Sequence, residues 1–272
     1  MIIVHDGKAH HDDFLATCVL IYKTNQRAIR TKALPEHLEN SEFWVVDQGL
    51  LFNPELHNFD HHHIREEICA FSMILDYFYG KSYREAFPNL RFVEIYDSYG
   101  PKLAAKFAKV SEESLDIIFS PICTSVINLF SNINGEINDP MYSVMKDIGK
   151  TICDQIETSE KYMNILESGV QNYSFNNIRI LDITDCKIED GFKIENLPTK
   201  KYCKDKRIEI DVILTKDSRN AGFYRMISSN TDVIKFLPNE KANFCHNSGF
   251  LISFKEFSDY KQILLNHIEK ND

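Results

Sequence analysis

The chain has 272 residues, of which 43% are hydrophobic and 26% charged, so it has the composition of an ordinary soluble protein and is long enough for two domains. Its net charge of -9 disfavours binding along nucleic-acid duplexes but does not exclude short anionic substrates. The seven cysteines include no Cys-x-x-Cys pair and no apolar run reaches the roughly 18 residues of a membrane span, so we expect a cytoplasmic protein with reduced thiols and no membrane contact.

The first 46 residues predict alternating strands and helices. Residues 2–5 and 29–33 are each predicted to form a strand. Between them, apolar side chains recur at the 3.6-residue spacing of a helix, namely Phe14, Leu15, Cys18, Val19 and Tyr22. Asp12 or Asp13 is predicted to cap this helix. Residues 43–46 are a continuous apolar run, typical of a buried parallel strand, so we expect an N-terminal α/β domain built on a parallel sheet.

The segment that follows is predicted to be mostly helical. A helix over residues 65–79 is expected to end at Gly80. The next helix, over roughly residues 90–97, carries Asp97 on its inward side and stops at Gly100 and Pro101. Residues 103–131 are predicted to be helical with one interruption near Pro121. A long helix over residues 139–168 is expected to act as a connector.

Short strand-like segments dominate the C-terminal part. They cover residues 178–183, 208–214 and 222–227 and indicate a second, smaller α/β or α+β domain. We therefore predict three parts: a catalytic domain over residues 1–135, a helical connector over 136–171 and a substrate-binding domain over 172–272. The basic segment from Lys200 to Arg207 is expected to be a loop, either solvated or in contact with substrate phosphates.

Histidines and aspartates concentrate near the N-terminus. Eight of the ten histidines fall within the first 63 residues, and Asp60 is followed directly by three of them. His5 and Asp47 come at the ends of predicted strands, where ligand-binding groups of parallel sheets collect. A dinuclear hydrolytic site needs a bridging carboxylate, further carboxylates and imidazoles. The sequence therefore predicts a metal centre assembled from several strand ends.

The spacing of these residues resembles a known family. The pattern His5-x-Gly7-x-x-His10-x-Asp12, then Val45-Val46-Asp47 with Asn53-Pro54, then Asp60-His61-His62 and Asp97, is similar to that of the DHH phosphoesterase superfamily. Within it, the sequence resembles the Myg1-like group, whose eukaryotic members act as metal-dependent 3′-5′ RNA exonucleases. The C-terminal segment Phe244-Cys245-His246-Asn247-Ser248-Gly249-Phe250 is similar to that group's second hallmark.

The resemblance implies a role for each matching residue. One cation is held by His5, His10 and Asp47, and the other by Asp12, Asp47, His61 and Asp97, with Asp47 as the bridge. Asp60 orients His61, and His62 faces the scissile phosphate. From its residues, the tight loop of His246, Asn247, Ser248 and Gly249 offers polar side chains and a nest of backbone N–H groups to an anion, so we expect it to bind the phosphate or terminal sugar of the substrate. His11, Asp13 and His63 depart from the family pattern, and His11 and His63 are expected to be solvated neighbours of the site.

The expected function is hydrolysis of a phosphodiester by a metal-dependent 3′-5′ exonuclease acting on short RNA or DNA. Imidazole-rich ligation favours Mn²⁺, Co²⁺, Fe²⁺ or Zn²⁺ over Mg²⁺, and Mn²⁺ is the ion that we expect in both positions. Two alternatives stay open: a phosphatase for small nucleotides, and a non-catalytic protein that binds a nucleotide through a metal. The expected partner is a short single-stranded nucleic acid or nucleotide, and a homodimer is one option for the oligomeric state.

Overall fold

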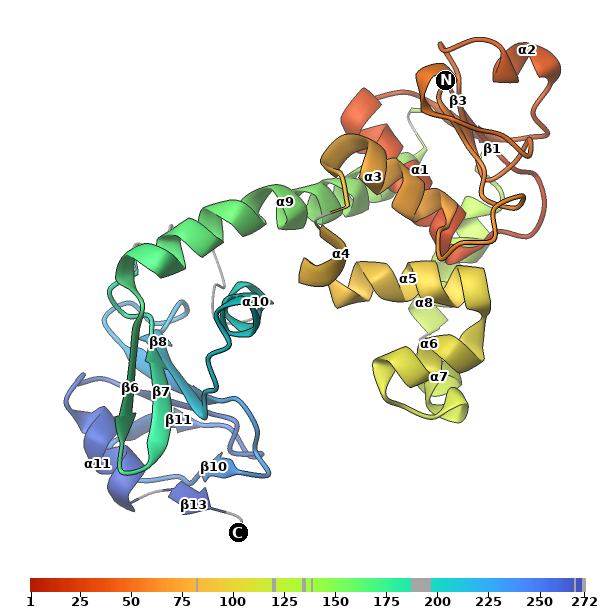
Figure 1. Cartoon of the computed structure of the whole chain (residues 1–272). Helices are drawn as coiled ribbons and strands as arrows, with labels where there is room; N and C mark the ends of the chain where they lie inside the picture. The colour runs from red at the N-terminus through yellow and green to blue at the C-terminus, as the bar shows by residue number, and fades with distance from the viewer. Residues whose placement is uncertain are drawn as a thin grey trace. The chain divides into compact units, whose positions relative to one another are not determined.

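The structure is a computed structural model, and it describes residues 1–81, 83–118, 121–133, 136–137, 139–186, 197–266 and 268–270 (Figure 1). The chain folds into two compact units, Met1–Glu157 and Thr158–Asp272. The division lies inside one long helix, α9 (Pro140–Gly169). The connector expected over residues 136–171 and the other domain limits stay predictions.

Unit 1 contains a five-stranded sheet in the order β2-β1-β3-β5-β4. Its strands are β1 (Ile2–Val4), β2 (Ala28–Arg30), β3 (Trp44–Val46), β4 (Phe52–Asn53) and β5 (Asn58–Phe59). β1 is parallel to β2 and β3, and β3 is parallel to β5, whereas β4 is antiparallel to β5. The predicted α/β class with a parallel sheet is confirmed. The strand expected over residues 29–33 is shorter and ends at Arg30.

The register of this sheet brings three strand ends to one edge. Val4 pairs with Val46, and Val46 pairs with Phe59. The residues that follow these three are His5, Asp47 and Asp60. Because parallel strands present their carboxyl ends on the same side of a sheet, the polar side chains of all three segments emerge there together. The apolar strands β1 and β3 are buried and hold this edge in place.

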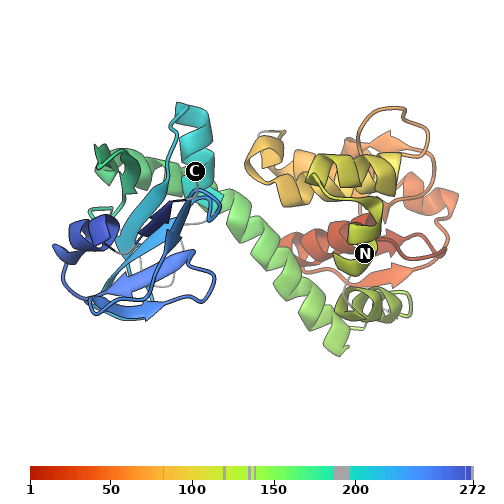
Figure 2. The ribbon, with the colours of Figure 1, turned by 90° about the horizontal axis from the view of Figure 1, so that it is seen from below.

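Unit 1 also contains helices. They are α1 (His11–Thr24), α2 (Pro35–Leu38), the 3₁₀ helix η1 (Pro54–Leu56), α3 (Ala70–Tyr79), α4 (Tyr83–Ala86), α5 (Pro88–Tyr99), α6 (Pro101–Ala108), α7 (Glu112–Ile118), α8 (Pro121–Phe130) and the first part of α9. Of these, α1, α2 and α3 contact the sheet. Helix α1 packs against α3, and α5, α6 and α7 follow one another in contact (Figure 2). Gly80 ends α3 with a positive φ of 67°, as expected for a helix terminator.

Two helix limits differ from the predictions. Helix α3 begins at Ala70 rather than near residue 65. The region 103–131 has a second break, because Lys109 takes a left-handed conformation with φ 58° and ends α6. Left-handed residues stop a helix without any proline or glycine, so apolar periodicity alone does not reveal them.

The start of helix α1 also differs from the prediction that Asp12 or Asp13 is its cap. His10 precedes the first helical residue in an extended conformation and takes the N-cap position. The carboxylate of Asp13 accepts the backbone N–H of His10 at 2.9 Å from inside the first turn. In a capping box, the side chain at the third helical position accepts the backbone N–H of the N-cap residue, and Asp13 makes this bond to His10.

Helix α9 is long, and within unit 1 its Gly149 permits a close approach to α1. A Cβ atom at Gly149 would lie 2.0 Å from the carbonyl oxygen of Cys18, a separation that no side chain tolerates. Glycine is therefore required where the two helices meet. Neither α9 nor any other helix in the described part of the chain has the length and apolar character needed to cross a membrane.

Unit 2 is built on a six-stranded sheet in the order β11-β12-β9-β8-β7-β6. Its strands are β6 (Gln171–Phe175), β7 (Ile178–Asp182), β8 (Val212–Lys216), β9 (Tyr224–Ser228), β11 (Ala242–Cys245) and β12 (Leu251–Phe254). A small second sheet pairs β10 (Ile234–Phe236) with β13 (Ile268–Lys270). Pairing in the six-stranded sheet is antiparallel except between β7 and β8.

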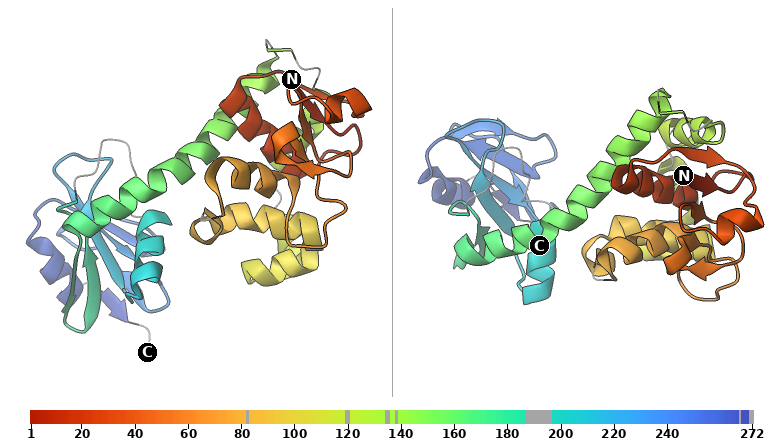
Figure 3. Two further views of the ribbon diagram at one scale, coloured as in Figure 1. Left: turned by 45° about the horizontal axis from the view of Figure 1, so that its top comes forward. Right: turned by 90° about the horizontal axis from the view of Figure 1, so that it is seen from above.

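Alternate residues of the central strands fill two separate cores in unit 2. Ile180 and Val212 pack with Ile263 of helix α11 (Asp259–Asn266), whereas Leu181 packs with Tyr202 of helix α10 (Leu197–Lys206). The two helices therefore cover opposite faces of the sheet (Figure 3). The expectation that Lys200 to Arg207 forms a loop was wrong: most of this segment belongs to α10, because Tyr202 and Cys203 anchor one helical face in the core.

Candidate metal centre

Seven side chains gather where the carboxyl edge of the unit 1 sheet meets α1 and α5. They form three overlapping groups in which the donor atoms lie within 4.8 Å of one another: His5, His10 and Asp47; Asp47, His61 and His62; and His10, Asp12 and Asp97. Asp47 and His10 each belong to two groups. The structure therefore brings together all six residues predicted as metal ligands, together with His62. Their individual roles as ligands stay predictions.

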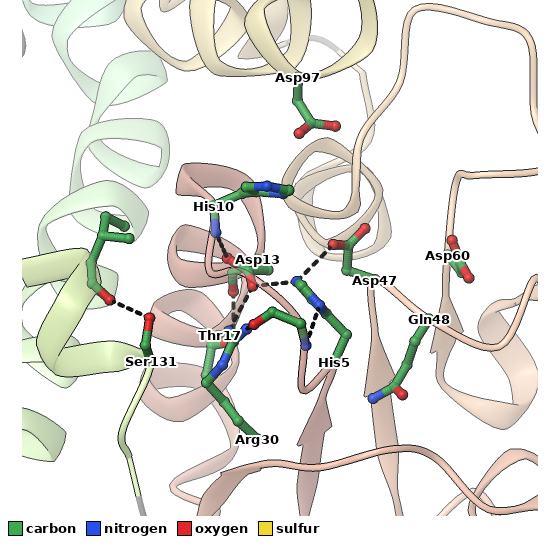
Figure 4. Close-up of polar contacts among 12 residues, drawn as sticks. His5, His10, Asp13, Thr17, Arg30, Asp47, Gln48, Asp60, Asp97 and Ser131 are labelled. Carbon is green, nitrogen blue, oxygen red and sulfur yellow. Dashed lines mark hydrogen bonds and ion pairs between the residues drawn. The ribbon is translucent and has the colours of Figure 1, made fainter. Parts of the chain in front are cut away.

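Asp47 lies at the centre of the groups, on a strained piece of backbone. It follows β3 directly with a left-handed φ of 58°, and its backbone N–H donates to the carbonyl of Phe59 at 2.9 Å. Its buried carboxylate faces two imidazoles. Oδ2 lies 3.4 Å from His5 Nε2 (Figure 4), and Oδ1 lies 3.3 Å from His61 Nε2. A carboxylate that uses both oxygens on opposite sides has the arrangement of a bridging ligand. The unusual φ is the kind of strain that folded proteins retain at functional sites.

His61 connects Asp47 with Asp97, although the two carboxylates come from different elements. Its Nε2 lies 3.1 Å from Asp97 Oδ2 as well as 3.3 Å from Asp47 Oδ1. Burial opposes the charged form, but hydrogen bonds to the two aspartates outweigh burial and raise the pKa of His61 to about 10. The two carboxylates thus create a local field that attracts a positive charge.

Asp12 provides the strongest test of whether a divalent cation fits. Its residue is only 1% exposed, and neither carboxylate oxygen accepts a hydrogen bond from a donor in the described part of the chain. Burial, followed by the charges of Asp47 and Asp97, raises the pKa of Asp12 well above its usual value. A buried carboxylate without donors is costly, and a cation bound between these groups removes that cost. The donor set therefore fits divalent metal ions.

Asp60 contacts a different histidine from the one predicted. Its Oδ1 lies 2.7 Å from His62 Nδ1 and accepts the backbone N–H of His62 at 2.9 Å, while Oδ2 accepts the N–H of Leu50. The expectation that Asp60 orients His61 is thus corrected. In the turn after β5 one carboxylate oxygen of Asp60 bonds the residue two positions later in the chain, as in Asx turns. Burial opposes ionisation, yet the bonds from His62 and Leu50 lower the pKa of Asp60.

Asp13 and Arg30 form a buried ion pair that the sequence analysis missed. Arg30 Nη1 lies 2.7 Å from Asp13 Oδ2, and both side chains are almost fully buried. The same oxygen is 2.8 Å from His5 Nε2, and this hydrogen bond raises the pKa of His5. Arg30 also donates to the carbonyl of Gly7 at 2.9 Å. One signal was present in the sequence: Arg30 ends the strand next to β1, so its side chain emerges at the edge where carboxylates gather.

Comparison with known proteins agrees with this arrangement. A family model, MYG1_exonuc, described as "Uncharacterised protein family (UPF0160)", matches residues 1–179. The chain belongs to this family. The matched range includes every residue of the three groups, and the predicted Myg1-like membership is confirmed. A search among curated proteins gives no match.

One solved structure is weakly similar to the chain. It is titled a member of the s1p family of ribosomal proteins, DHH domain, and the comparison covers 97% of this chain and 84% of that chain with 15% identity. The TM-score is 0.29, which is too low to support an argument about fold or function. Membership of the wider DHH superfamily therefore stays a prediction.

The MYG1_exonuc match ends before the predicted substrate-binding loop of His246, Asn247, Ser248 and Gly249. The structure places this loop at the turn of the hairpin between β11 and β12, with the first three side chains exposed. His246 Nδ1 lies 2.9 Å from Ser248 Oγ and accepts the N–H of Ser248, and the N–H of Gly249 donates to the carbonyl of His246. The idea that these backbone N–H groups form an anion nest is corrected, because the turn uses them itself. The exposed side chains stay the predicted contacts.

The two histidines that depart from the family pattern give a prediction about metal content. His63 is exposed, and neither His11 nor His63 belongs to the three groups of donor atoms. We expect the variants His11→Ala and His63→Ala to bind as much Mn²⁺ as the unmodified protein. His61→Ala is expected to lose metal, because it removes an imidazole ligand that lies between Asp47 and Asp97. Metal bound per chain after dialysis, measured by elemental analysis, tests this. Loss of metal from either of the first two variants would show that the ligands are misassigned.

Proposed function

We propose that the protein is a metal-dependent phosphoesterase that acts as a 3′-5′ exonuclease on short single-stranded RNA or DNA. The observation that carries the proposal is the overlap of the three donor groups at Asp47 and His10, which is the arrangement that a two-metal hydrolytic site requires. The exonuclease activity is supported by the name of the family to which the chain belongs. The negative net charge agrees with a short substrate that is drawn to a local metal site rather than to a basic surface.

In this proposal Asp47 would contribute to both metal sites. His5 and His10 would complete one set of ligands, and Asp12, His61 and Asp97 would complete the other. When bound, divalent cations supply activation of water and neutralisation of charge on the phosphate. The mixture of imidazoles and carboxylates suits Mn²⁺, Co²⁺, Fe²⁺ or Zn²⁺ better than Mg²⁺, and Mn²⁺ is the ion that we propose.

His62 is assigned to the substrate rather than to a metal. Its Nδ1 is occupied by the carboxylate of Asp60 at 2.7 Å and lies farther, at 3.7 Å, from Asp47 Oδ1. The side chain is 54% exposed, so its second nitrogen is accessible to a bound phosphate. Asp60 fixes the orientation of the His62 ring, as a carboxylate bonded to one ring nitrogen does for a histidine in catalysis or metal binding. In the proposed reaction His62 donates a hydrogen bond or a proton to the scissile phosphate group.

The test is a panel of short RNA and DNA oligonucleotides labelled at the 5′ or 3′ end, together with mononucleotides, each with Mn²⁺, Mg²⁺ or Zn²⁺. The expected result is stepwise shortening of 5′-labelled oligonucleotides with Mn²⁺. Release of inorganic phosphate from mononucleotides without shortening would instead favour a phosphatase. Metal-dependent binding of a nucleotide without any hydrolysis would favour a non-catalytic binding protein. The Asp47→Asn variant serves as the control for contaminating nucleases.

A separate prediction concerns the hairpin turn in unit 2. We propose that His246 binds the phosphate or terminal sugar of the substrate and holds no metal, because no carboxylate belongs to the turn. His246→Ala is expected to retain its metal and to lose roughly 10- to 100-fold in kcat/KM on an oligonucleotide, since polar contacts to an anion disappear.

The same variant provides its own internal control. Hydrolysis of bis(p-nitrophenyl) phosphate, a phosphodiester with neither sugar nor nucleobase, is expected to stay close to that of the unmodified protein. The comparison is made on protein with measured metal content. An equal loss on both substrates, or a loss of metal, would contradict the division of work between the turn and the metal centre.

A further inference from the structure

Unit 1 contains a cavity of about 630 Å³ beside the metal centre. It is lined by the loop before α1, the first turn of α1, α5, the junction of α5 with α6, and α8. A volume of this size is typical of pockets that bind small molecules.

One end of the cavity is part of the metal centre. Three of its lining residues, His10, Asp12 and Asp97, form one of the three groups of donor atoms. In Figure 4 the carboxylate of Asp97 projects from α5 toward His10. A phosphate held at these groups therefore has the cavity as its immediate neighbour, and the rest of the same molecule extends into it.

Most of the remaining lining is apolar or aromatic. On α5, Phe92 and Tyr96 are one turn apart with ring centroids 5.9 Å from each other, and both are partly exposed. Each of them also packs against the small core around Ile95 and Ala104. The core supports both residues, and both also line the cavity. Rings held in this way are suitable partners for a flat, unsaturated group.

Polar side chains are present at a few positions of the same cavity. Thr124 and Asn128 are one turn apart on α8 (Pro121–Phe130), and Lys8 lies in the loop before α1. An amide such as that of Asn128 both donates and accepts hydrogen bonds, and it matches the edge of a nucleobase. A flat heterocycle next to the aromatic rings, with the amide of Asn128 at its edge and a phosphate at the metal-site end, matches these features of the lining.

We propose that the cavity binds the nucleobase of the 3′-terminal nucleotide, the one whose phosphate lies at the metal centre. This inference rests on the proposed function and names the part of the substrate that the site recognises. Tyr96 and Phe92 stack on the base, and Asn128 contacts its edge. The pocket makes the terminal base, in addition to the phosphate, a requirement for efficient hydrolysis.

The experiment compares two oligonucleotides that differ only in the 3′-terminal unit, which carries a base in one and is an abasic tetrahydrofuran unit in the other. The unmodified protein is expected to prefer the first by about 10-fold or more in kcat/KM, because stacking on an aromatic side chain stabilises a bound base. Tyr96→Leu is expected to lower kcat/KM on the base-bearing substrate by roughly 5- to 50-fold, and Asn128→Ala by about 3- to 10-fold. Neither variant is expected to change cleavage of the abasic substrate by more than about 2-fold.

Tyr99→Leu is the matched control, because Tyr99 lies on the same helix, is 45% exposed and does not line the cavity. It is expected to cleave both substrates like the unmodified protein. Equal losses on the two substrates in Tyr96→Leu and Asn128→Ala, or an unmodified protein without preference for the base, would overturn the inference.

If the unmodified protein cleaves neither oligonucleotide, the proposed function fails, and binding then tests the pocket on its own. Adenosine 5′-monophosphate and ribose 5-phosphate are titrated onto the Mn²⁺-loaded protein. Tighter binding of the first, lost in Tyr96→Leu but kept in Tyr99→Leu, supports a nucleobase pocket. Equal binding of the two ligands overturns it.

Discussion

Replacing Asp47 by asparagine is expected to abolish turnover and to lower the bound metal from two ions per chain to one or none. A neutral amide bridges two cations poorly, and the loss of the bridge removes charge from both sets of ligands. Asparagine tolerates the left-handed φ of 58° at this position, so the substitution changes the charge without disturbing the backbone. We expect a decrease in kcat/KM of at least roughly 1000-fold, since charge stabilisation by metals contributes several kcal/mol to catalysis.

Elemental analysis of dialysed protein and the oligonucleotide assay measure the two effects of this variant. The control is Asp6→Asn, because Asp6 is an exposed aspartate next to His5 that does not belong to the donor groups. It is expected to keep both metals and full activity. An Asp47→Asn protein that still turns over substrate at nearly the unmodified rate would exclude the dinuclear assignment.

Replacing Arg30 by methionine is expected to destabilise unit 1 by about 3–5 kcal/mol, because it leaves the carboxylate of Asp13 buried without its cation. Asp13 is fully buried, and Arg30 is its charged partner at 2.7 Å. Methionine is chosen because it keeps much of the length of the side chain. Urea unfolding followed by tryptophan fluorescence measures the loss in this unit, since Trp44, the single tryptophan of the chain, lies in β3.

Two further variants define the cause of that loss. Arg27→Met removes an exposed pair with Glu136 and is expected to cost less than about 1 kcal/mol. In the double variant Arg30→Met with Asp13→Asn, the unpaired charge is gone, so part of the stability is expected to return. A free energy of unfolding for Arg30→Met within about 1 kcal/mol of the unmodified value would argue against a structural role for the ion pair.

Much of the metal centre was predictable because its residues follow regular elements. His5 and Asp47 come directly after apolar strands, and parallel strands carry such residues to one edge of a sheet. Asp97 was placed correctly on the inward side of its helix by its distance from Val93, one turn earlier. The structure groups all six predicted metal ligands, although their function as ligands stays a prediction.

What sequence reasoning did not find depends on side-chain contacts rather than on periodicity. Asp60 contacts His62 instead of His61, because the turn after β5 brings the His62 ring to 2.7 Å from the Asp60 carboxylate. The segment from Lys200 looked like a solvated loop, since five basic residues conceal the apolar face that Tyr202 and Cys203 bury. The N–H groups of His246 and Gly249 donate to carbonyls within the hairpin, and these bonds form only when β11 and β12 pair.

The sequence by itself determined that β1 and β3 are buried strands, where the main helices of unit 1 lie and which chemical groups are present at the metal centre, because these follow from local apolar spacing and residue type. Only the tertiary structure decided which groups face each other. The register of β1, β3 and β5, the ion pair of Asp13 with Arg30 and the cavity between α5 and α8 all depend on packing between segments far apart in the chain. Such contacts are set by the minimum free energy of the whole fold, so no local pattern contains them.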